Sequence, residues 1–241
     1  MQHRRHVLGL GCLAALSALS KSLALAAEPI PVDLELILAV DTSGSVSSDR
    51  FDLQKEGYSE AFANPNVLDA IRSGMHRAIA VTMLQWTGPA LQTQVVDWMR
   101  IDDAASAARF SAAVAAAPRA LFSGGTSISG AIDRAAGLFA QSGYRGERRV
   151  IDVSGDGSNN RGRPAEEARD DALRVGVGIN GLPILTLEPS LDEYYRANVI
   201  GGPGAFVIAI DRYEDFAAAI LRKLIQEIAG EGREPPYRIA R

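Results

Sequence analysis

Short apolar runs recur along the chain and alternate with segments of helical periodicity. Five of these runs are nearly continuous in apolar side chains: 34–40, 78–84, 150–153, 182–187 and 206–210. A short run of this kind is typical of a strand that is buried on both faces of a parallel sheet. We therefore expect buried strands at these five positions.

Between the apolar runs, large apolar side chains recur with the spacing of one helix face. The first such segment follows Ser47 and Asp49, which belong to the residue types that favour a helix start. Because residues three and four positions apart share one side of a helix, each face is expected to pack on the sheet. The three faces consist of Phe51, Tyr58 and Phe62; of Ile128, Ile132, Ala135 and Phe139; and of Phe216, Ile220, Leu224 and Ile228.

The segment 91–99 is expected to form an antiparallel edge strand. It follows the run at 78–84 after a turn of Thr87, Gly88 and Pro89, and such a connection is too short to cross over to a parallel strand. Elsewhere strands and helices alternate, so the sequence predicts an α/β fold with a doubly wound, mostly parallel open sheet. Sheets of this kind place their ligand site at the carboxyl ends of the strands.

The amino-terminal residues have the composition of a secretory signal peptide. Arg4 and Arg5 precede the apolar stretch 7–20, and the small residues of 24–26 form a cleavage site. The pair Arg4-Arg5 also resembles a twin-arginine signal, so general secretory and twin-arginine export both stay open. We expect a signal peptide at 1–26, one domain at 32–230 and a flexible tail at 231–241, with the mature protein periplasmic or secreted.

Charge and cysteine content narrow the classes of partner. The formal net charge is −4, and loss of Arg4, Arg5 and Lys21 with the signal peptide would take it to −7. A mildly acidic protein is poorly suited to nucleic acid. The single cysteine, Cys12, lies within the predicted signal peptide, so no disulfide is expected in the mature domain. No run is long and uncharged enough to predict a membrane span.

Oxygen-bearing side chains gather in three loops next to the predicted strands. The first loop places Asp41, Ser43 and Ser45 directly after the run at 34–40. The second offers Thr126, where two glycines give way to a helix, and the third offers Asp156 after the run at 150–153. Since parallel strands end at one edge of a sheet, we expect these oxygens to face a common centre.

The five candidate ligands include no thiol and no imidazole, and this favours a hard cation. Mg²⁺ prefers six oxygen ligands and keeps some of its waters, with Mn²⁺ or Ca²⁺ as alternatives. Because Asp41 and Asp156 are the only charged ligands, a bound divalent ion would stay strongly electrophilic. An open coordination position would then attract an Asp or Glu carboxylate from a partner protein.

These motifs resemble the metal-ion-dependent adhesion site of von Willebrand factor A domains. The resemblance rests on Asp-x-Ser-x-Ser at 41–45, Gly-Gly-Thr-Ser at 124–127 and Asp-Gly at 156–157, and it covers about 32–230 in element order. The segments 39–45 and 153–160 are also similar to an uncharacterised bacterial family of exported A-like proteins. The resemblance implies that Asp41, Ser43, Ser45, Thr126 and Asp156 hold the metal, one carboxylate acting through water. Many A domains have a Thr before the last Asp, where this chain has Gly155.

An enzymatic reading is the main alternative to a binding module. A haloacid dehalogenase-like Mg²⁺-dependent phosphohydrolase also presents an Asp at a strand end, but it needs a second carboxylate two residues later, where this chain has Ser43. A Ser-His-Asp hydrolase would have to use His76, and no Gly-x-Ser-x-Gly motif directs a serine toward it. We therefore predict that the protein is not an enzyme. A third reading is a structural domain whose metal site is not functional.

Four further residues carry predictions about the surroundings of the site. Trp86 ends the second strand on the ligand face and is a candidate partner-binding residue, with packing against the sheet end as its alternative. Asp152 interrupts an apolar strand and, as a buried carboxylate, needs partners; we expect it to tie down a neighbouring loop. Asn159 and Asn160 either orient metal ligands or form an ordinary turn.

Overall fold

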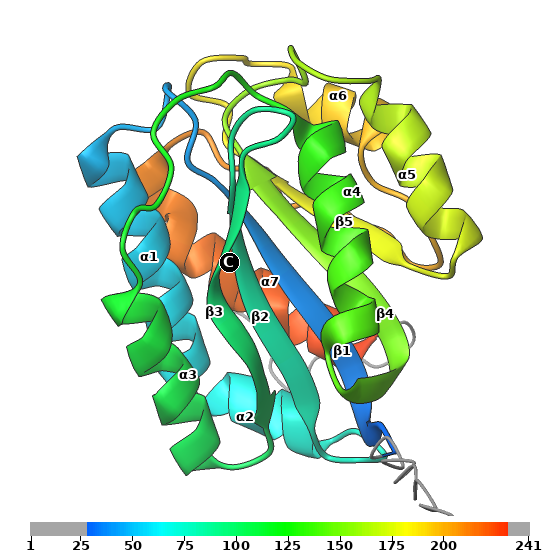
Figure 1. Cartoon of the computed structure of the whole chain (residues 1–241). Helices are drawn as coiled ribbons and strands as arrows, with labels where there is room; N and C mark the ends of the chain where they lie inside the picture. The colour runs from blue at the N-terminus through cyan, green and yellow to red at the C-terminus, as the bar shows by residue number, and fades with distance from the viewer. Residues whose placement is uncertain (1–27, 231–241) are drawn as a thin grey trace, which may run out of the picture.

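The computed structural model describes residues 28–230, which form one sheet between two layers of helices (Figure 1). The sheet has the order β3-β2-β1-β4-β5. Its strands are β1 (Ile30–Asp41), β2 (Ile79–Trp86), β3 (Gln92–Ile101), β4 (Tyr144–Gly155) and β5 (Gly178–Pro183). All neighbours pair in parallel except β2 and β3. The predicted fold class is therefore confirmed, with β3 as the antiparallel edge strand.

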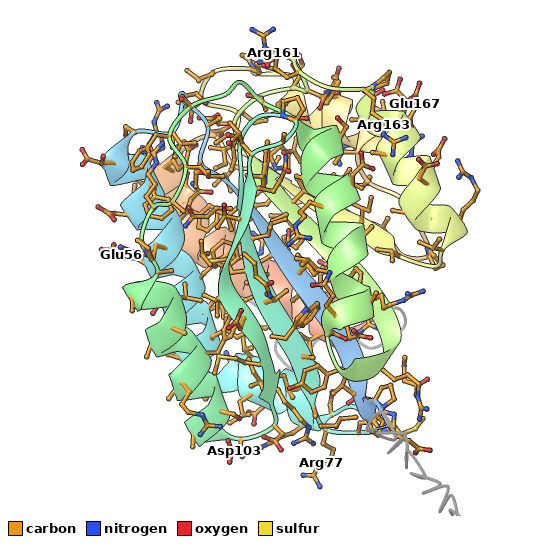
Figure 2. The ribbon with its side chains drawn as sticks, in the orientation of Figure 1. Glu56, Arg77, Asp103, Arg161, Arg163 and Glu167 are labelled. Atoms are coloured by element: carbon orange, nitrogen blue, oxygen red, sulfur yellow. The ribbon has the colours of Figure 1, made fainter. Side chains whose placement is uncertain are left out.

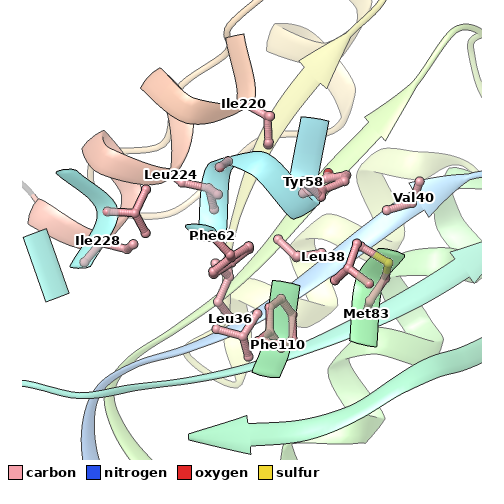
Figure 3. Packing of buried hydrophobic residues seen from close by; sticks show 14 of the residues in the cluster. Leu36, Leu38, Val40, Tyr58, Phe62, Met83, Phe110, Ile220, Leu224 and Ile228 are labelled. Carbon is pink, nitrogen blue, oxygen red and sulfur yellow. The ribbon is translucent and has the colours of Figure 1, made fainter. Parts of the chain in front are cut away.

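Alternate side chains of the central strands point to opposite faces, and each face carries its own layer of helices. One layer contains α1 (Ser48–Ala63), α2 (Pro65–Arg72), α3 (Ala104–Ala116) and α7 (Phe216–Ala229). Figure 3 shows how Leu36 and Leu38 of β1 pack with Tyr58 and Phe62 of α1 on this face. The other layer contains α4 (Ile128–Leu138), α5 (Ala165–Arg174) and α6 (Leu191–Asn198), packed on Ile37 and neighbouring apolar residues.

The last two predicted strands differ from the structure. The strand expected at 182–187 lies earlier, as β5. Its first residues, Gly-Ile-Asn-Gly, include small and polar residues and therefore do not form a continuous apolar run in the sequence. Gly181 has to be small, since a Cβ there would come within 2.5 Å of the Tyr195 ring. Residues 206–210 pair with β5 and its extension through isolated bridges and not as a sixth regular strand. One reason is that the Phe206 N–H donates to the Asn180 side chain, 2.8 Å away.

The prediction for Asp152 was wrong about its partner. Its carboxylate lies 2.7 Å from the ammonium nitrogen of Lys223 on α7, and both side chains are fully buried. Lys223 also pairs with Glu227 at 2.9 Å, and Glu227 accepts a hydrogen bond from Asn180 at 2.8 Å. Asp152 therefore ties a helix, not a loop, to the sheet. The predicted signal peptide at 1–26 and tail at 231–241 lie outside the described residues.

Candidate metal site

The strand order brings the first and third predicted metal loops together. β1 and β4 are parallel neighbours in a register that pairs Val40 with Ser154, so Asp41 and Asp156 leave the sheet side by side. Ser45 Oγ donates a hydrogen bond to Asp156 Oδ1 at 2.5 Å, and the hydroxyl oxygens of Ser43 and Ser45 are 3.0 Å apart. Four of the five predicted ligands thus converge at one sheet edge.

Thr126 approaches the same edge from the loop between α3 and α4. Its Oγ1 lies 3.8 Å from the position that a Cβ on Gly157 would take, which places the hydroxyl beside the loop that carries Asp156. The Thr126 N–H donates to Asn160 Oδ1 at 3.0 Å, and the Thr126 carbonyl accepts from the Asn160 N–H at 2.9 Å. Asn160 therefore fixes the second loop against the third. Of the two roles considered from the sequence, these contacts favour the orienting role over an ordinary turn.

Asn159 also makes specific contacts and does not simply complete a turn. Its Oδ1 accepts from the Ser129 N–H at 3.1 Å, at the start of α4, and its side-chain nitrogen donates to the Arg163 carbonyl at 3.0 Å. Asn159 and Asn160 thus join the third loop to the start of α4 and to the loop that carries Thr126.

Asp41 is a buried carboxylate of the site. Its Oδ1 accepts the Ser43 N–H at 2.7 Å, whereas its Oδ2 is buried with no hydrogen-bond partner among residues 28–230. Burial, followed by the nearby Asp156 charge, raises the pKa of Asp41 to about 7. A cation bound here would give the buried Asp41 oxygen a partner and would balance the charges of Asp41 and Asp156.

Asp156 is held by residues from two other elements. The Tyr213 hydroxyl donates to its Oδ2 at 2.8 Å, from the short 3-10 turn (Tyr213–Asp215) that precedes α7. A guanidinium nitrogen of Arg50 lies 3.7 Å from the same oxygen and donates to the Ser45 carbonyl at 2.9 Å. The Arg50 guanidinium also lies 5.1 Å from the centre of the Tyr213 ring. The sequence pattern did not reveal either residue, because both lie far from Asp156 along the chain.

Arg119 forms hydrogen bonds with the backbone of the first loop. One terminal nitrogen of its guanidinium donates to the backbone oxygens of Thr42 at 3.1 Å, Ser43 at 3.2 Å and Val46 at 2.6 Å. These carbonyls belong to Ser43 and to residues next to the candidate ligands, so Arg119 holds the backbone of the first loop.

The prediction that Trp86 is a partner-binding residue was wrong. Its side chain is fully buried in the core between the sheet and the α4 layer, which is the packing alternative. Trp86 instead lies under the metal loops, next to Gly155: a Cβ on Gly155 would come within 3.2 Å of Trp86 Cζ2, 3.1 Å of the Tyr195 hydroxyl and 3.0 Å of Asp41 Oδ2. Gly155 therefore leaves room for the Asp41 carboxylate.

The residues present fit a divalent cation that prefers oxygen. Asp41 and Asp156 supply charge, and Ser43, Ser45 and Thr126 supply neutral oxygens. The five side chains offer two carboxylates and three hydroxyls, with no thiol or imidazole among them, and such all-oxygen donors are typical of Mg²⁺, Ca²⁺ or Mn²⁺ sites. A bound ion here would act as an electrophile toward an incoming oxygen ligand.

The sequence matches one protein family over most of its length. Residues 31–232 match the family described as "Protein of unknown function (DUF1194)". No curated protein matches the sequence. No helix among the described residues has the length and apolar character needed to cross a bilayer.

Several solved structures share the fold, and one of them is described as a von Willebrand factor type A protein. Proximal thread matrix protein 1 from the mussel byssus, with a zinc-occupied MIDAS motif, has a TM-score of 0.59 at 12% identity over 84% of this chain and 50% of its own. The pilus adhesin SpaC of Lactobacillus rhamnosus GG gives 0.57 at 15% identity over 82% of this chain and 31% of its own. A von Willebrand factor type A protein from Catenulispora acidiphila gives 0.52 at 17% identity over 83% and 43%.

These similarities confirm the von Willebrand factor A-like fold. The chain spans about half the length of the mussel protein, and less of the other two.

Proposed function

The chain belongs to the DUF1194 family, and we propose that it is a protein-binding module that uses a bound divalent ion, preferably Mg²⁺, to capture a carboxylate of its partner. The observation that carries this proposal is the buried Asp41 Oδ2, which has no hydrogen-bond partner among the described residues and belongs to a carboxylate that lies near the Asp156 charge. A cation is the ligand that relieves both the burial and the repulsion of these two carboxylates.

The charge balance supports capture of a further carboxylate. Asp41 and Asp156 neutralise a divalent ion only if both bind it directly, and the three hydroxyl ligands add no charge. An Asp or Glu from another protein is then favoured over water at an open position, because it adds direct coordination and a negative charge. Ser45, which is partly exposed, and the exposed Gly44 leave the first loop open to solvent.

A phosphohydrolase is less well supported by the surroundings of the site. Such a reaction needs a general acid two residues after the nucleophile, where the chain has Ser43, and a lysine that holds the phosphate. Lys223 is buried in its pair with Asp152, and Lys55 pairs with Asp52 on α1. Neither of the two lysines in the described residues contacts the metal loops.

The proposed setting is outside the cytoplasm. The arginine-led apolar segment and the small residues at 24–26 support export to the periplasm or the medium. A Mg²⁺ site is compatible with this setting because it depends on hydroxyls and carboxylates and not on reduced thiols.

Two measurements test the proposed function. Calorimetric titration of the protein with Mg²⁺, Mn²⁺ and Ca²⁺ is expected to show one site that the Asp41→Ala variant lacks, while the exposed-carboxylate control Asp52→Ala keeps it. Partner capture from the exporting cell is then compared for wild type, wild type with EDTA and Thr126→Ala. Capture that persists unchanged in EDTA and in Thr126→Ala would show that the metal site is structural.

A further inference from the structure

Apolar and cationic side chains that are exposed or partly exposed lie beside the loops of the candidate metal site. We call Arg50, Leu91, Phe122 and Arg161 the rim. The side chain of Phe122 is 61% exposed and that of Leu91 is 42% exposed, although residues of these types are usually buried. An exposed aromatic beside a polar site is a common feature of protein interfaces.

Phe122 and Leu91 stand directly beside the metal loops. The Phe122 carbonyl oxygen lies 3.9 Å from the position of a Cβ on Gly44, in the loop that carries Ser43 and Ser45. The Phe122 ring is held by the Arg119 guanidinium, 4.9 Å from its centre. On the other side, Leu91 packs on Gly124, two residues before Thr126, since a Cβ on Gly124 would come within 2.5 Å of Leu91 Cδ1. Phe122 therefore borders the first loop, and Leu91 borders the second.

The two cations of the rim lie beside different loops, Arg50 at the first loop and Arg161 at the second. Arg50 approaches Asp156 at 3.7 Å and is partly exposed. Arg161 lies over Gly125, whose Cβ position is 2.5 Å from the Arg161 Cγ, and it has no carboxylate partner among residues 28–230. Figure 2 shows Arg161 extending outward at the loop end of the molecule, opposite Arg77 and Asp103. Its neighbour Arg163, by contrast, is paired with Asp133 and Asp171.

We propose that the rim selects the residues next to the captured carboxylate, and that the partner is an acidic protein segment with a large apolar side chain adjacent to its metal-binding Asp or Glu. This inference rests on the proposed function. The apolar side chain of the partner covers Phe122 and Leu91. A second carboxylate of the partner pairs with Arg161, because the rim offers cations in a protein whose net charge is negative.

The probes for this inference are four short capped peptides. One is Gly-Gly-Asp-Gly-Gly, two carry Phe before or after the Asp, and one carries Phe together with a second acidic residue. Their affinities are measured by titration calorimetry in Mg²⁺ and in EDTA against wild type, Phe122→Ser and Arg161→Ala. Met75→Ser and Arg145→Ala are matched controls, since both side chains are exposed near the amino-terminal ends of the strands.

In Mg²⁺, the better Phe-containing peptide is expected to bind wild type about tenfold more tightly than the glycine peptide. Phe122→Ser is expected to remove this advantage, and Arg161→Ala to weaken the doubly acidic peptide by about threefold, while Met75→Ser and Arg145→Ala bind as wild type does. Mg²⁺ affinity itself is expected to stay unchanged in Phe122→Ser.

Two outcomes separate this inference from the proposed function. Mg²⁺-dependent binding of all four peptides with equal affinity, or an equal loss in Phe122→Ser and Met75→Ser, would overturn the inference and leave carboxylate capture standing. Absence of Mg²⁺-dependent binding for every peptide, with Mg²⁺ itself bound, would overturn both.

Discussion

The ammonium nitrogen of Lys223 lies 2.7 Å from a carboxylate oxygen of Asp152, and neither side chain is accessible to solvent. The pair joins α7 to the interior strand β4, and Glu227 adds a second carboxylate to the same ammonium at 2.9 Å. Burial by itself would lower the pKa of Lys223, but attraction by Asp152 and Glu227 and their hydrogen bonds raise it above its usual value. Lys223 therefore stays charged in the core.

Replacement of Lys223 by Met is expected to destabilise the fold strongly. The change leaves Asp152 and Glu227 buried without their cation, and breaking a buried pair in this way costs about 3–5 kcal/mol. Urea unfolding at pH 8 measures the loss, with Lys55→Met on the surface of α1 as the control. A loss no larger than that of the control would show that the buried pair does not stabilise the fold.

The Asp152→Asn variant is expected to change the pH dependence of stability. Burial, only partly offset by Lys223, raises the pKa of Asp152 to about 6 from an ordinary 3.8. A raised carboxyl pKa means that the native state binds the proton more tightly, so its contribution to the free energy of unfolding is lost as pH rises from about 4 to about 6.

Asp152→Asn cannot titrate, so its stability relative to wild type is expected to increase across this window. Unfolding in urea at several pH values, in EDTA, provides the comparison. A constant difference between the two proteins from pH 4 to pH 7 would contradict the raised pKa.

Asp41→Asn is expected to stabilise the metal-free protein and to abolish its response to Mg²⁺. Without an ion, an ionised Asp41 is buried beside Asp156, and its contribution to stability is lost as pH rises through its native pKa of about 7. At pH 8 in EDTA the variant is expected to be more stable by at least about 1 kcal/mol. Mg²⁺ at a hundred times its Kd is expected to add about 2.7 kcal/mol to wild type only. Equal responses of both proteins to Mg²⁺ would place the ion elsewhere.

Arg119→Met is expected to weaken Mg²⁺ binding about tenfold or more, because groups that orient metal ligands contribute on this scale. The variant loses the donor that holds three carbonyl oxygens of the first loop. Arg119→Lys keeps the charge but not the planar guanidinium, and its Mg²⁺ affinity is expected to lie between those of wild type and Arg119→Met. The exposed Arg109→Met on α3 is the control in the calorimetric titration, and an affinity equal to this control would remove Arg119 from the site.

Gly155→Ala is expected to reduce Mg²⁺ affinity with only a modest loss of stability. The added Cβ would lie 3.0 Å from Asp41 Oδ2 and 3.1 Å from the Tyr195 hydroxyl, so the carboxylate has to move. Gly137→Ala on α4 meets no atom within 4 Å and is expected to stabilise the helix by about 1 kcal/mol. Unchanged Mg²⁺ affinity in Gly155→Ala would mean that Asp41 does not bind the ion through this orientation.

The candidate ligands could be identified from the sequence because they form short local motifs at strand ends. Asp41, Ser43 and Ser45 occupy one loop, and the alternation of strands and helices predicts which loops meet. The residues that orient these ligands were not predictable in this way. Tyr213 contacts Asp156 across 57 positions of the chain, and Arg119 reaches the Thr42 carbonyl across 77. No periodic pattern records such contacts.

The sequence-based predictions for Trp86 and Asp152 were wrong because the environment of each side chain depends on several elements at once. Trp86 stands at the ligand end of its strand, yet α4 and the neighbouring strands enclose it. Asp152 required a partner, but the nearest basic residue in space comes from α7, beyond two further helices. In both cases a strand was predicted at the right place in the chain, but the role of the residue depends on the elements that pack against that strand.

The irregular pairing of residues 201–210 has a consequence for self-association. The N–H and carbonyl of Ile179 both bond to Gly201, the N–H of Gly181 bonds to the Phe206 carbonyl, and the Gly181 carbonyl accepts from Ile208. The outer edge of β5 therefore has its outward backbone groups occupied although no regular sixth strand covers it. An exposed strand edge is a template for polymerisation. By occupying it with a bent segment, the protein closes this side of the sheet to a second copy and so resists aggregation through strand addition.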